Sequence, residues 1–235
     1  MIKKAMILAA GFGKRIHPLT LKNPKPLLRI GNETLLSNTL KFLEMYEIKD
    51  VVINVHYLGE QIINYIKNKK FNLTIKIVKE GEKILDTGGG VLNALDYFSS
   101  EPFLIINPDT IWNSNYLEEL KSMENLVFKN KKKCFLLVVN KEKIFDKSLK
   151  GDFNLKDNLI TREDKNNLKH IFTGLQIIMP EAFSKIDGKV FSMNKIWDNL
   201  IKTDELYGVE SEIDFLHVST LSIYRSLIEK KLYVK

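Results

Sequence analysis

Glycines and two cations lie close together after a short apolar stretch near the amino terminus. Gly11 and Gly13 follow the apolar residues 5–9, with Arg15 two positions on and Lys25 held between two prolines. Glycines directly after a strand allow a tight turn whose amide N–H groups face an anion. Arginine offers a planar fork of donors and lysine a compact charge, and both suit phosphate oxygens. The pattern therefore predicts a phosphate-binding loop. The alternative is a simple turn with surface cations.

This loop differs from two common phosphate-binding motifs. It lacks the third glycine of a dinucleotide fingerprint, and it lacks the Gly-Lys-Ser/Thr ending of a Walker loop. The chemistry must therefore be inferred from the loop together with its cations.

A carboxylate that could bind a metal ion follows another apolar stretch. Residues 103–106 are Phe-Leu-Ile-Ile, and Asn107-Pro-Asp109 comes next. Open α/β sheets bind ligands beyond the carboxyl ends of their strands. Mg²⁺ prefers oxygen ligands, usually one or two carboxylates with phosphates and water. Asp109 is therefore predicted as a ligand of a Mg²⁺ cofactor. The alternative is a turn-forming Asp after proline.

A second glycine run, Thr87-Gly-Gly-Gly90, precedes a helical pattern that begins near Val91. Glycines without side chains allow a flat base or ribose to lie against the backbone, and a helix amino end adds a modest positive potential. The run is consistent with a nucleoside site, or with a tight turn that binds nothing.

The elements that must position these residues alternate along the chain. Apolar runs predict strands, and helical periodicity predicts helices. The expected strands are 5–9, 51–55, 73–78, 103–106, 135–139 and 174–178, and the expected helices are 35–46, 59–68, 89–98, 195–202 and 221–231. This alternation predicts an α/β fold with a mostly parallel sheet covered on both faces. No internal repeat or linker is visible, so residues 1–235 are expected to form a single domain.

Composition narrows the class of protein. The 235 residues are 44% hydrophobic, which is enough for a sizeable core. The single Cys134 lies in an apolar run, and no apolar stretch approaches the roughly 18 residues of a membrane span. We therefore expect a cytoplasmic protein without a membrane partner. The net charge of +7 comes mostly from scattered lysines, and the cluster at 129–133 is expected to be a solvated loop. A nucleic-acid partner is not expected, although an RNA-binding module is the alternative that basicity suggests.

The motifs resemble those of the sugar-phosphate nucleotidyltransferases. Residues 8–27 are similar to the leading motif of that family, which is usually Leu-Ala-Ala-Gly-x-Gly-x-Arg followed by Pro-Lys-Pro. The resemblance extends in order through Asp86-Thr-Gly-Gly-Gly90, Asn107-Pro-Asp109, Phe172-Thr-Gly-Leu-Gln176, Phe191-Ser-Met-Asn194 and His217-Val-Ser-Thr220. These segments resemble one branch of the family, the N-acetylmuramate 1-phosphate uridylyltransferases.

This resemblance implies a fold, a reaction and a set of site residues. The fold is a single Rossmann-like three-layer domain of the nucleotide-diphospho-sugar transferase type. The reaction joins a nucleoside triphosphate, here UTP, to a sugar 1-phosphate and releases pyrophosphate. Arg15, Lys25 and Asp109 are the implied catalytic residues. The implied nucleotide-binding residues are Ala10, Gly11, Phe12, Gly13, Lys25, Gly88, Gly89 and Asn107. The sugar-phosphate candidates are Asn140, Asp152, Thr173, Gly174 and His217.

Two departures from the family pattern concern the metal. Pro108 stands where many relatives have glycine, and His217-Val-Ser-Thr220 stands where many have Asp-Val-Gly-Thr. A neutral imidazole is a poor ligand for Mg²⁺. The ion would then be held by Asp109 with phosphates and water, or would recruit Asp214. His217 could instead donate a hydrogen bond to the sugar phosphate, or be purely structural.

Three questions stay open in the sequence. The chain could instead be a guanylyl-, thymidylyl- or cytidylyltransferase that acts on another sugar or alcohol phosphate. The chain could also be a non-catalytic regulatory protein that binds nucleotide sugars, and its oligomeric state is not encoded in any visible pattern. No general base is assigned, because a phosphate monoester with a second pKa of about 6 is already ionised near neutral pH.

Overall fold

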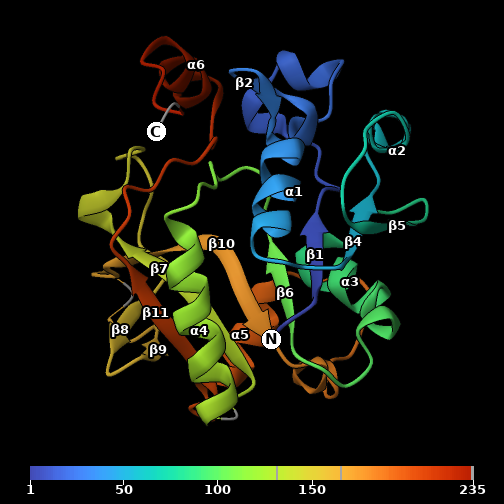
Figure 1. Ribbon diagram of the computed structural model, residues 1–235. Coiled ribbons are helices and arrows are strands. Elements are labelled where there is room, and N and C mark those ends of the chain that lie inside the picture. Colours follow the sequence, from blue (N-terminus) through green and yellow to red (C-terminus); the bar gives the residue numbers. More distant parts are fainter. Residues whose placement is uncertain (131, 165, 234–235) are drawn as a thin grey trace.

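A nine-stranded sheet runs through the computed structural model, which describes residues 1–130, 132–164 and 166–233 (Figure 1). Its strands, in spatial order, are β5 (Thr74–Lys79), β4 (Asp50–Val55), β1 (Lys4–Leu8), β6 (Phe103–Ile106), β10 (His170–Ile178), β7 (Cys134–Asn140), β11 (Leu206–Ser211), β9 (Leu159–Thr161) and β8 (Asn154–Lys156). A separate small ribbon pairs β2 (Arg29–Ile30) with β3 (Glu33–Thr34).

The sheet is mixed but mostly parallel. β5, β4, β1 and β6 pair in parallel, whereas β10 is antiparallel to both of its neighbours, β6 and β7. β7 and β11 are parallel to each other and run in the same direction as the first four strands. The first four strands of this sheet along the chain are β1, β4, β5 and β6, and they lie side by side in the order third, second, first and fourth. The chain therefore switches sides of the sheet between β1 and β6. Ligands of doubly wound sheets bind in the crevice at such a switch point, beyond the carboxyl ends of the strands.

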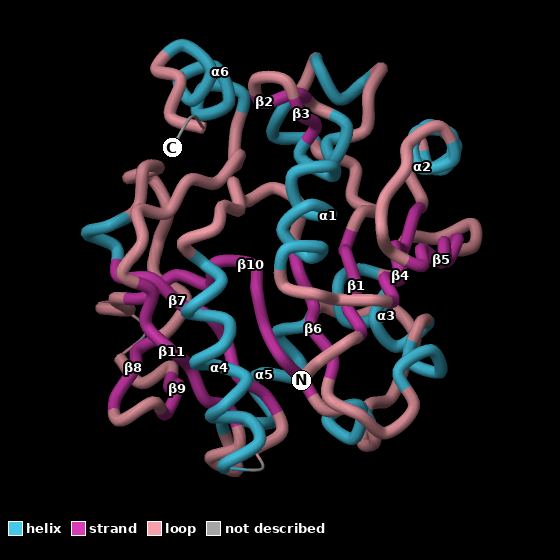
Figure 2. Tube along the Cα trace, viewed as in Figure 1, coloured by secondary structure: helices cyan, strands magenta, loops and turns pink. Residues whose placement is uncertain are grey.

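Helices cover both faces of the sheet, which produces three layers (Figure 2). The helices are α1 (Leu35–Met45), α2 (Gly59–Lys67), α3 (Asp86–Asn93), α4 (Tyr116–Asn130), α5 (Met193–Ile201) and α6 (Leu221–Glu229). Along β1, Ala5 and Ile7 pack with side chains of α1, α2 and α4, whereas Met6 packs with those of α3 and α5. This alternation follows from the two-residue period of a strand whose two faces are both buried. The fold class predicted from the sequence is confirmed.

Some predicted elements are placed wrongly or were missed. The third predicted helix, 89–98, in fact begins at Asp86 and ends at Asn93, and Leu95–Phe98 is a separate 3₁₀ turn. The last predicted strand begins four residues before Gly174, at His170. α4 was not predicted, although its buried Leu120, Met123 and Val127 have helical spacing. The strands β2, β3, β8, β9 and β11 were also missed.

The lysine cluster at 129–133 is only partly a loop. Lys129 belongs to the last turn of α4, and the ammonium of Lys132 lies 5.2 Å from the centre of the Tyr207 ring. Lys131 lies outside the described residues. Cys134 is buried and free, and burial raises the pKa of its thiol. In the part of the chain that is described, no helix has the length and apolar character needed to cross a membrane.

Close packing of α3 predicts a specific sensitivity to an added methyl group. A Cβ on Gly89 would lie 2.1 Å from the carbonyl oxygen of Lys189, a backbone atom that cannot move aside cheaply. We expect Gly89→Ala to destabilise the protein by about 1–3 kcal/mol, as overpacking commonly does. Urea denaturation measures this change. Gly81→Ala is the matched control, because nothing lies within 4 Å of a Cβ there. Equal stabilities of the two variants would contradict the packing described for α3.

Candidate active site

The turn after β1 is fixed by a side chain from the neighbouring strand. The amide of Ala9 donates to Oδ1 of Asn54 on β4 at 3.0 Å, and Nδ2 of Asn54 donates to Glu80 at 2.7 Å. Gly11 is exposed, with nothing near the position of a Cβ. Gly13 has a φ of 64°, and a Cβ there would lie 3.0 Å from Thr20. Gly13 is therefore required both by its left-handed backbone and by its lack of a side chain.

An arm of residues 14–28 leaves this turn and carries the two predicted cations. It folds into three short 3₁₀ turns, Lys14–Ile16, Leu19–Leu21 and Lys25–Leu27. Ile16 and Leu28 are buried against side chains of α6. This packing turns Lys25 back toward the end of β6, although the two segments are far apart in sequence.

Asp109 lies three residues beyond β6, and one of its carboxylate oxygens contacts two side-chain nitrogens. Nζ of Lys25 forms an ion pair with Oδ2, and Nε2 of His217 lies 3.1 Å from the same oxygen. A strand bridge between Thr110 and His217 and the bond from the Val218 amide to the Asp109 carbonyl at 2.8 Å bring the two segments together. The other oxygen, Oδ1, is buried and has no hydrogen-bond partner within the described ranges.

This environment keeps Asp109 ionised. Burial alone would raise the pKa of the carboxyl group, but Lys25 and His217 more than offset that effect and hold the pKa well below its usual range. The carboxylate is therefore ready to bind a cation through Oδ1 at any physiological pH.

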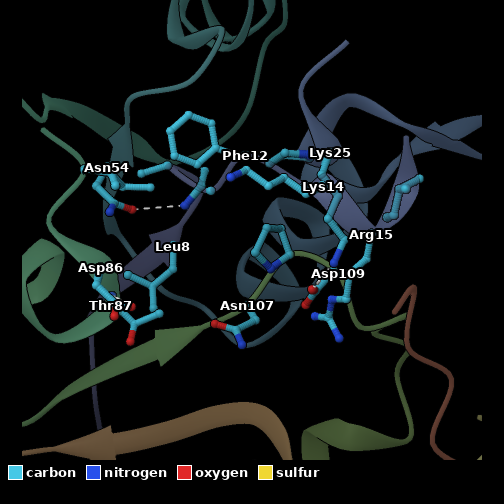
Figure 3. Close-up of a pocket in the computed structure, with 18 of the residues that line it drawn as sticks. Leu8, Phe12, Lys14, Arg15, Lys25, Asn54, Asp86, Thr87, Asn107 and Asp109 are labelled. Atoms are coloured by element: carbon cyan, nitrogen blue, oxygen red, sulfur yellow. Dashed lines mark hydrogen bonds and ion pairs between the residues drawn. The ribbon is translucent and has the colours of Figure 1, made fainter. Parts of the chain in front are cut away.

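A cavity of about 450 Å³ opens between the turn after β1, the arm, the start of α3 and the end of β6. Figure 3 shows Arg15 near Asp109 at one end of this cavity, with Asp86 and Thr87 at the other. Lys14, Arg15 and Lys25 all line it. Arg15 is exposed and forms no ion pair with any described residue, so its guanidinium is available to an anion. The cavity combines a glycine-containing backbone turn, three cations and a carboxylate, which suits a polyphosphate.

Most of the predicted nucleotide-binding residues lie along this cavity. Ala10, Gly11, Phe12, Gly13, Lys25 and Asn107 line it, together with the predicted catalytic residues Arg15 and Asp109. Gly88 and Gly89 do not. They are buried in the first turn of α3, where a Cβ on Gly88 would lie 2.4 Å from the Phe191 ring. The structure thus explains these glycines by close packing, and their contact with a nucleotide stays a prediction.

Sequence reasoning missed several lining residues. Ile84, Asp86, Thr87, Lys14, Asn54 and Ser219 also line the cavity. Asp86 and Thr87 stand directly before the glycine run, and they would have been found if the start of α3 had been predicted at Asp86. Oγ1 of Thr87 accepts a hydrogen bond from the Met193 amide at 2.9 Å, which ties the start of α3 to the start of α5.

The predicted sugar-phosphate residues lie outside the lining of this cavity: Asn140 ends β7, Thr173 and Gly174 lie within β10, Asp152 contacts β10, and His217 lies beside Asp109. Oγ1 of Thr173 donates to the Leu137 carbonyl at 2.9 Å, and Oδ1 of Asn140 accepts from the Glu142 amide at 3.1 Å. Asp152 accepts from the Phe172 amide at 3.0 Å, and burial raises the pKa of its carboxyl group. Each of these side chains thus has a structural partner, and their role toward a sugar phosphate stays a prediction.

Gly174 connects this region to the cavity. The pairing of β10 with β7 is irregular between Phe172 and Gln176, and Gly174 within that bulge has a φ of 93°. Its carbonyl accepts a hydrogen bond from the Asn107 amide at 2.7 Å. Bulges of this kind redirect side chains next to functional sites. Here the bulge fixes the backbone of Asn107 at the edge of the cavity.

Asp109 is suited to hold a divalent ion together with a substrate. The described residues contain no group of three or more His, Cys, Asp and Glu side chains arranged for a metal. Asp214, the suggested second ligand, lines a different cavity. The buried, unpartnered Oδ1 of Asp109 nevertheless provides one hard oxygen ligand. Mg²⁺ usually needs only one or two carboxylates when phosphates and water complete its shell, so the residues present fit such an ion.

Comparison with known proteins agrees with this geometry. The sequence model of the nucleotidyl transferase family matches residues 4–146. An N-acetylmuramate alpha-1-phosphate uridylyltransferase of Caulobacter vibrioides is 27% identical over 225 residues, 92% of this chain and 91% of that protein. Its namesake from Neisseria meningitidis serogroup B is 29% identical over 221 residues, 93% of this chain and 94% of that protein.

The fold has solved counterparts as well. A structure of UDP-glucose pyrophosphorylase complexed with UDP-glucose matches with a TM-score of 0.79 at 16% identity, and the match covers 100% of both chains. The family match spans more than half of the chain, and the two uridylyltransferases align along nearly all of it. The chain therefore belongs to the nucleotidyl transferase family, among the sugar-phosphate nucleotidyltransferases.

Proposed function

We propose that this protein is a Mg²⁺-dependent uridylyltransferase that joins UTP to N-acetylmuramate 1-phosphate. The observation that carries the proposal is the meeting of Lys25 and Asp109 at the mouth of a glycine-bordered, cation-lined cavity. Support for the base and sugar comes from the names of the two relatives that align along nearly all of the chain. The product would serve nucleotide-sugar synthesis in peptidoglycan recycling.

The reaction is a phosphoryl-centred substitution. An oxygen of the sugar 1-phosphate forms a bond to the α-phosphorus of UTP, and the bond from that phosphorus to the bridging oxygen of the β-phosphate breaks. Pyrophosphate leaves with the electron pair of that bond. The attacking oxygen is already ionised near neutral pH, since the second pKa of a phosphate monoester is about 6. The protein therefore has to neutralise charge and align two anions, without a general base.

Lys25 and Arg15 are placed for that task. Arg15, which is paired with no described residue, presents its guanidinium fork at the cavity and can engage two phosphate oxygens at once. Lys25 lines the cavity beside Asp109, so its ammonium can contact a phosphate while still near the carboxylate. Mg²⁺ held by Oδ1 of Asp109 would add positive charge at the phosphates. The amides of the turn at Gly11 and Gly13 add donors that carry no charge.

His217 contacts Asp109 and does not act as a second metal ligand. Its ring stacks on Phe215 at 5.6 Å with an interplanar angle of 15°, and Nε2 faces Oδ2 of Asp109. A histidine in this position holds the carboxylate but offers Mg²⁺ no second oxygen. Weak binding of the free ion follows, because one carboxylate flanked by an ammonium group attracts a dication poorly.

The reaction itself can be tested with a substrate matrix. Purified protein is incubated with each common nucleoside triphosphate, each of several sugar 1-phosphates and Mg²⁺, and pyrophosphate release is followed. We expect the fastest turnover with UTP and N-acetylmuramate 1-phosphate. Faster turnover with another pair would correct the base or the sugar. Binding of nucleotide sugars without turnover of any pair would identify a regulatory protein instead.

The roles of the ion pair can be tested by substitution. We expect Lys25→Ala and Asp109→Asn each to lower kcat/KM by about 10²–10³-fold, because the first removes a cation that stabilises the transition state and the second removes the carboxylate that would hold Mg²⁺. Circular dichroism should show both variants folded. Lys49→Ala, which removes an exposed lysine outside the cavity, is the control. Near-normal rates in either site variant would show that the assignment is wrong.

The metal site can be tested without turnover by electron paramagnetic resonance of Mn²⁺. We expect the protein to bind Mn²⁺ tightly only when UTP is present. His217→Asp adds a second carboxylate and should lower the Kd for Mn²⁺ alone on the order of tenfold, whereas the equally small His217→Asn should not. Tight binding of Mn²⁺ by the unaltered protein without nucleotide, or full activity in excess chelator, would contradict the single-carboxylate site.

A further inference from the structure

The arm of residues 14–28 carries Arg15 and Lys25 but contributes no strand to the main sheet. Figure 1 shows this blue segment lying between α6 on one side and α2 on the other. On the α6 side the contacts are apolar, with Ile16 and Leu28 packed near Tyr224 and Leu227. Apolar packing holds the arm down but is not directional. Directional contacts must therefore come from elsewhere.

The turn between β4 and α2 provides them. The hydroxyl of Tyr57 donates to the carbonyl of Thr20 at 2.9 Å, and Nε2 of Gln61 donates to the carbonyl of Lys22 at 2.9 Å. The Tyr57 ring also packs on Phe12, with ring centres 5.3 Å apart. Two contacts from this turn and one from the first turn of α2 thus reach both the arm and the glycine turn that precedes it.

The contact at Thr20 continues to the glycine turn through a second hydrogen bond. Thr20 is fully buried, and its Oγ1 donates to the carbonyl of Gly13 at 2.8 Å. The methyl group of Thr20 lies where a Cβ of Gly13 would be only 3.0 Å away. Tyr57, Thr20 and Gly13 therefore form one chain of contacts between the segment after β4 and the glycine turn at the cavity.

The backbone beside Tyr57 is held in an unfavourable conformation. Leu58 has a φ of 50°, in the left-handed region that costs energy for a residue with a Cβ. Such outliers persist where the surrounding structure demands them, and they concentrate at functional sites. Here the left-handed residue separates Tyr57, which faces the arm, from the start of α2, which brings Gln61 to Lys22.

We propose that Tyr57 is a positioning residue for triphosphate binding, which acts by fixing the arm that presents Arg15 and Lys25. This inference rests on the proposed function, because it takes a nucleoside triphosphate as the ligand of that cavity. Tyr57 does not line the cavity. Its effect therefore passes through Thr20, Gly13 and the arm, and not through contact with the substrate.

The test separates this role from a general structural one. Tyr57→Phe removes the hydroxyl and keeps the ring on Phe12. We expect the KM and the Kd for UTP to rise about three- to tenfold, the effect of one neutral hydrogen bond, while the KM for the sugar 1-phosphate and the Tm stay unchanged. Tyr97→Phe is the control, since Tyr97 is exposed and lies outside the cavity. An unchanged KM for UTP, or equal losses in the two KM values with a lower Tm, would overturn the proposal.

A double-mutant cycle with Arg15→Ala tests the route of the effect. If Tyr57 acts by placing Arg15, Tyr57→Phe should weaken UTP binding by clearly less in the Arg15→Ala background than in the unaltered protein. Equal factors in both backgrounds would overturn the proposal. Isothermal titration of UTP supplies these constants without turnover.

An unaltered protein that binds UTP normally, with no effect of Tyr57→Phe, would overturn this inference alone. An unaltered protein that binds no nucleoside triphosphate would overturn the proposed function with it.

Discussion

The ion pair of Lys25 with Asp109 is the contact on which the arrangement of the site depends. It joins the arm that follows β1 to the end of β6, where the chain changes sides of the sheet. A largely buried ion pair costs desolvation energy, and that cost is offset only when geometry and further partners are good. His217 is such a partner for the carboxylate, and the packing of the arm on α6 keeps the ammonium in place. The sheet, the arm and the segment at His217 can thus be understood as the framework that holds this pair.

The two halves of the crevice are built differently. On the side of β1, the exposed guanidinium of Arg15 lines an open cavity and forms no ion pair with any described residue, whereas Lys25 is paired with Asp109. On the side of β7 and β10, the side chains of Asn140, Asp152 and Thr173 are already bound to the backbone. The β1 side of the crevice is thus open to an anion, whereas the side chains on the β7 and β10 side are held by contacts within the protein.

Local signals in the sequence predicted several residues that lie together at this cavity, and their roles toward a nucleotide stay predictions. The glycines at 11 and 13, Lys25 between its prolines and Asp109 after an apolar strand depend on short-range geometry, and the structure places all four along one cavity. The sequence could not show that the glycine run at 88–90 faces inward, because the start of α3 and its contact with Lys189 and Phe191 depend on tertiary packing. The bulge at Gly174 is also beyond local reasoning, since it depends on the pairing of β10 with two neighbours.

The packing of α3 limits how the end of the cavity at Asp86 and Thr87 can be altered. Gly88 and Gly89 touch the segment before α5, and Thr87 accepts a hydrogen bond from the first residue of that helix. Substitutions in the glycine run would therefore disturb two helices at once. Ile84 lines the same cavity without that constraint, whereas Asp86 has a φ of 61° and its carboxylate accepts a hydrogen bond from the Thr87 amide. A library that alters this end of the cavity would therefore retain more folded members if diversity were placed at Ile84 and kept out of the glycine run.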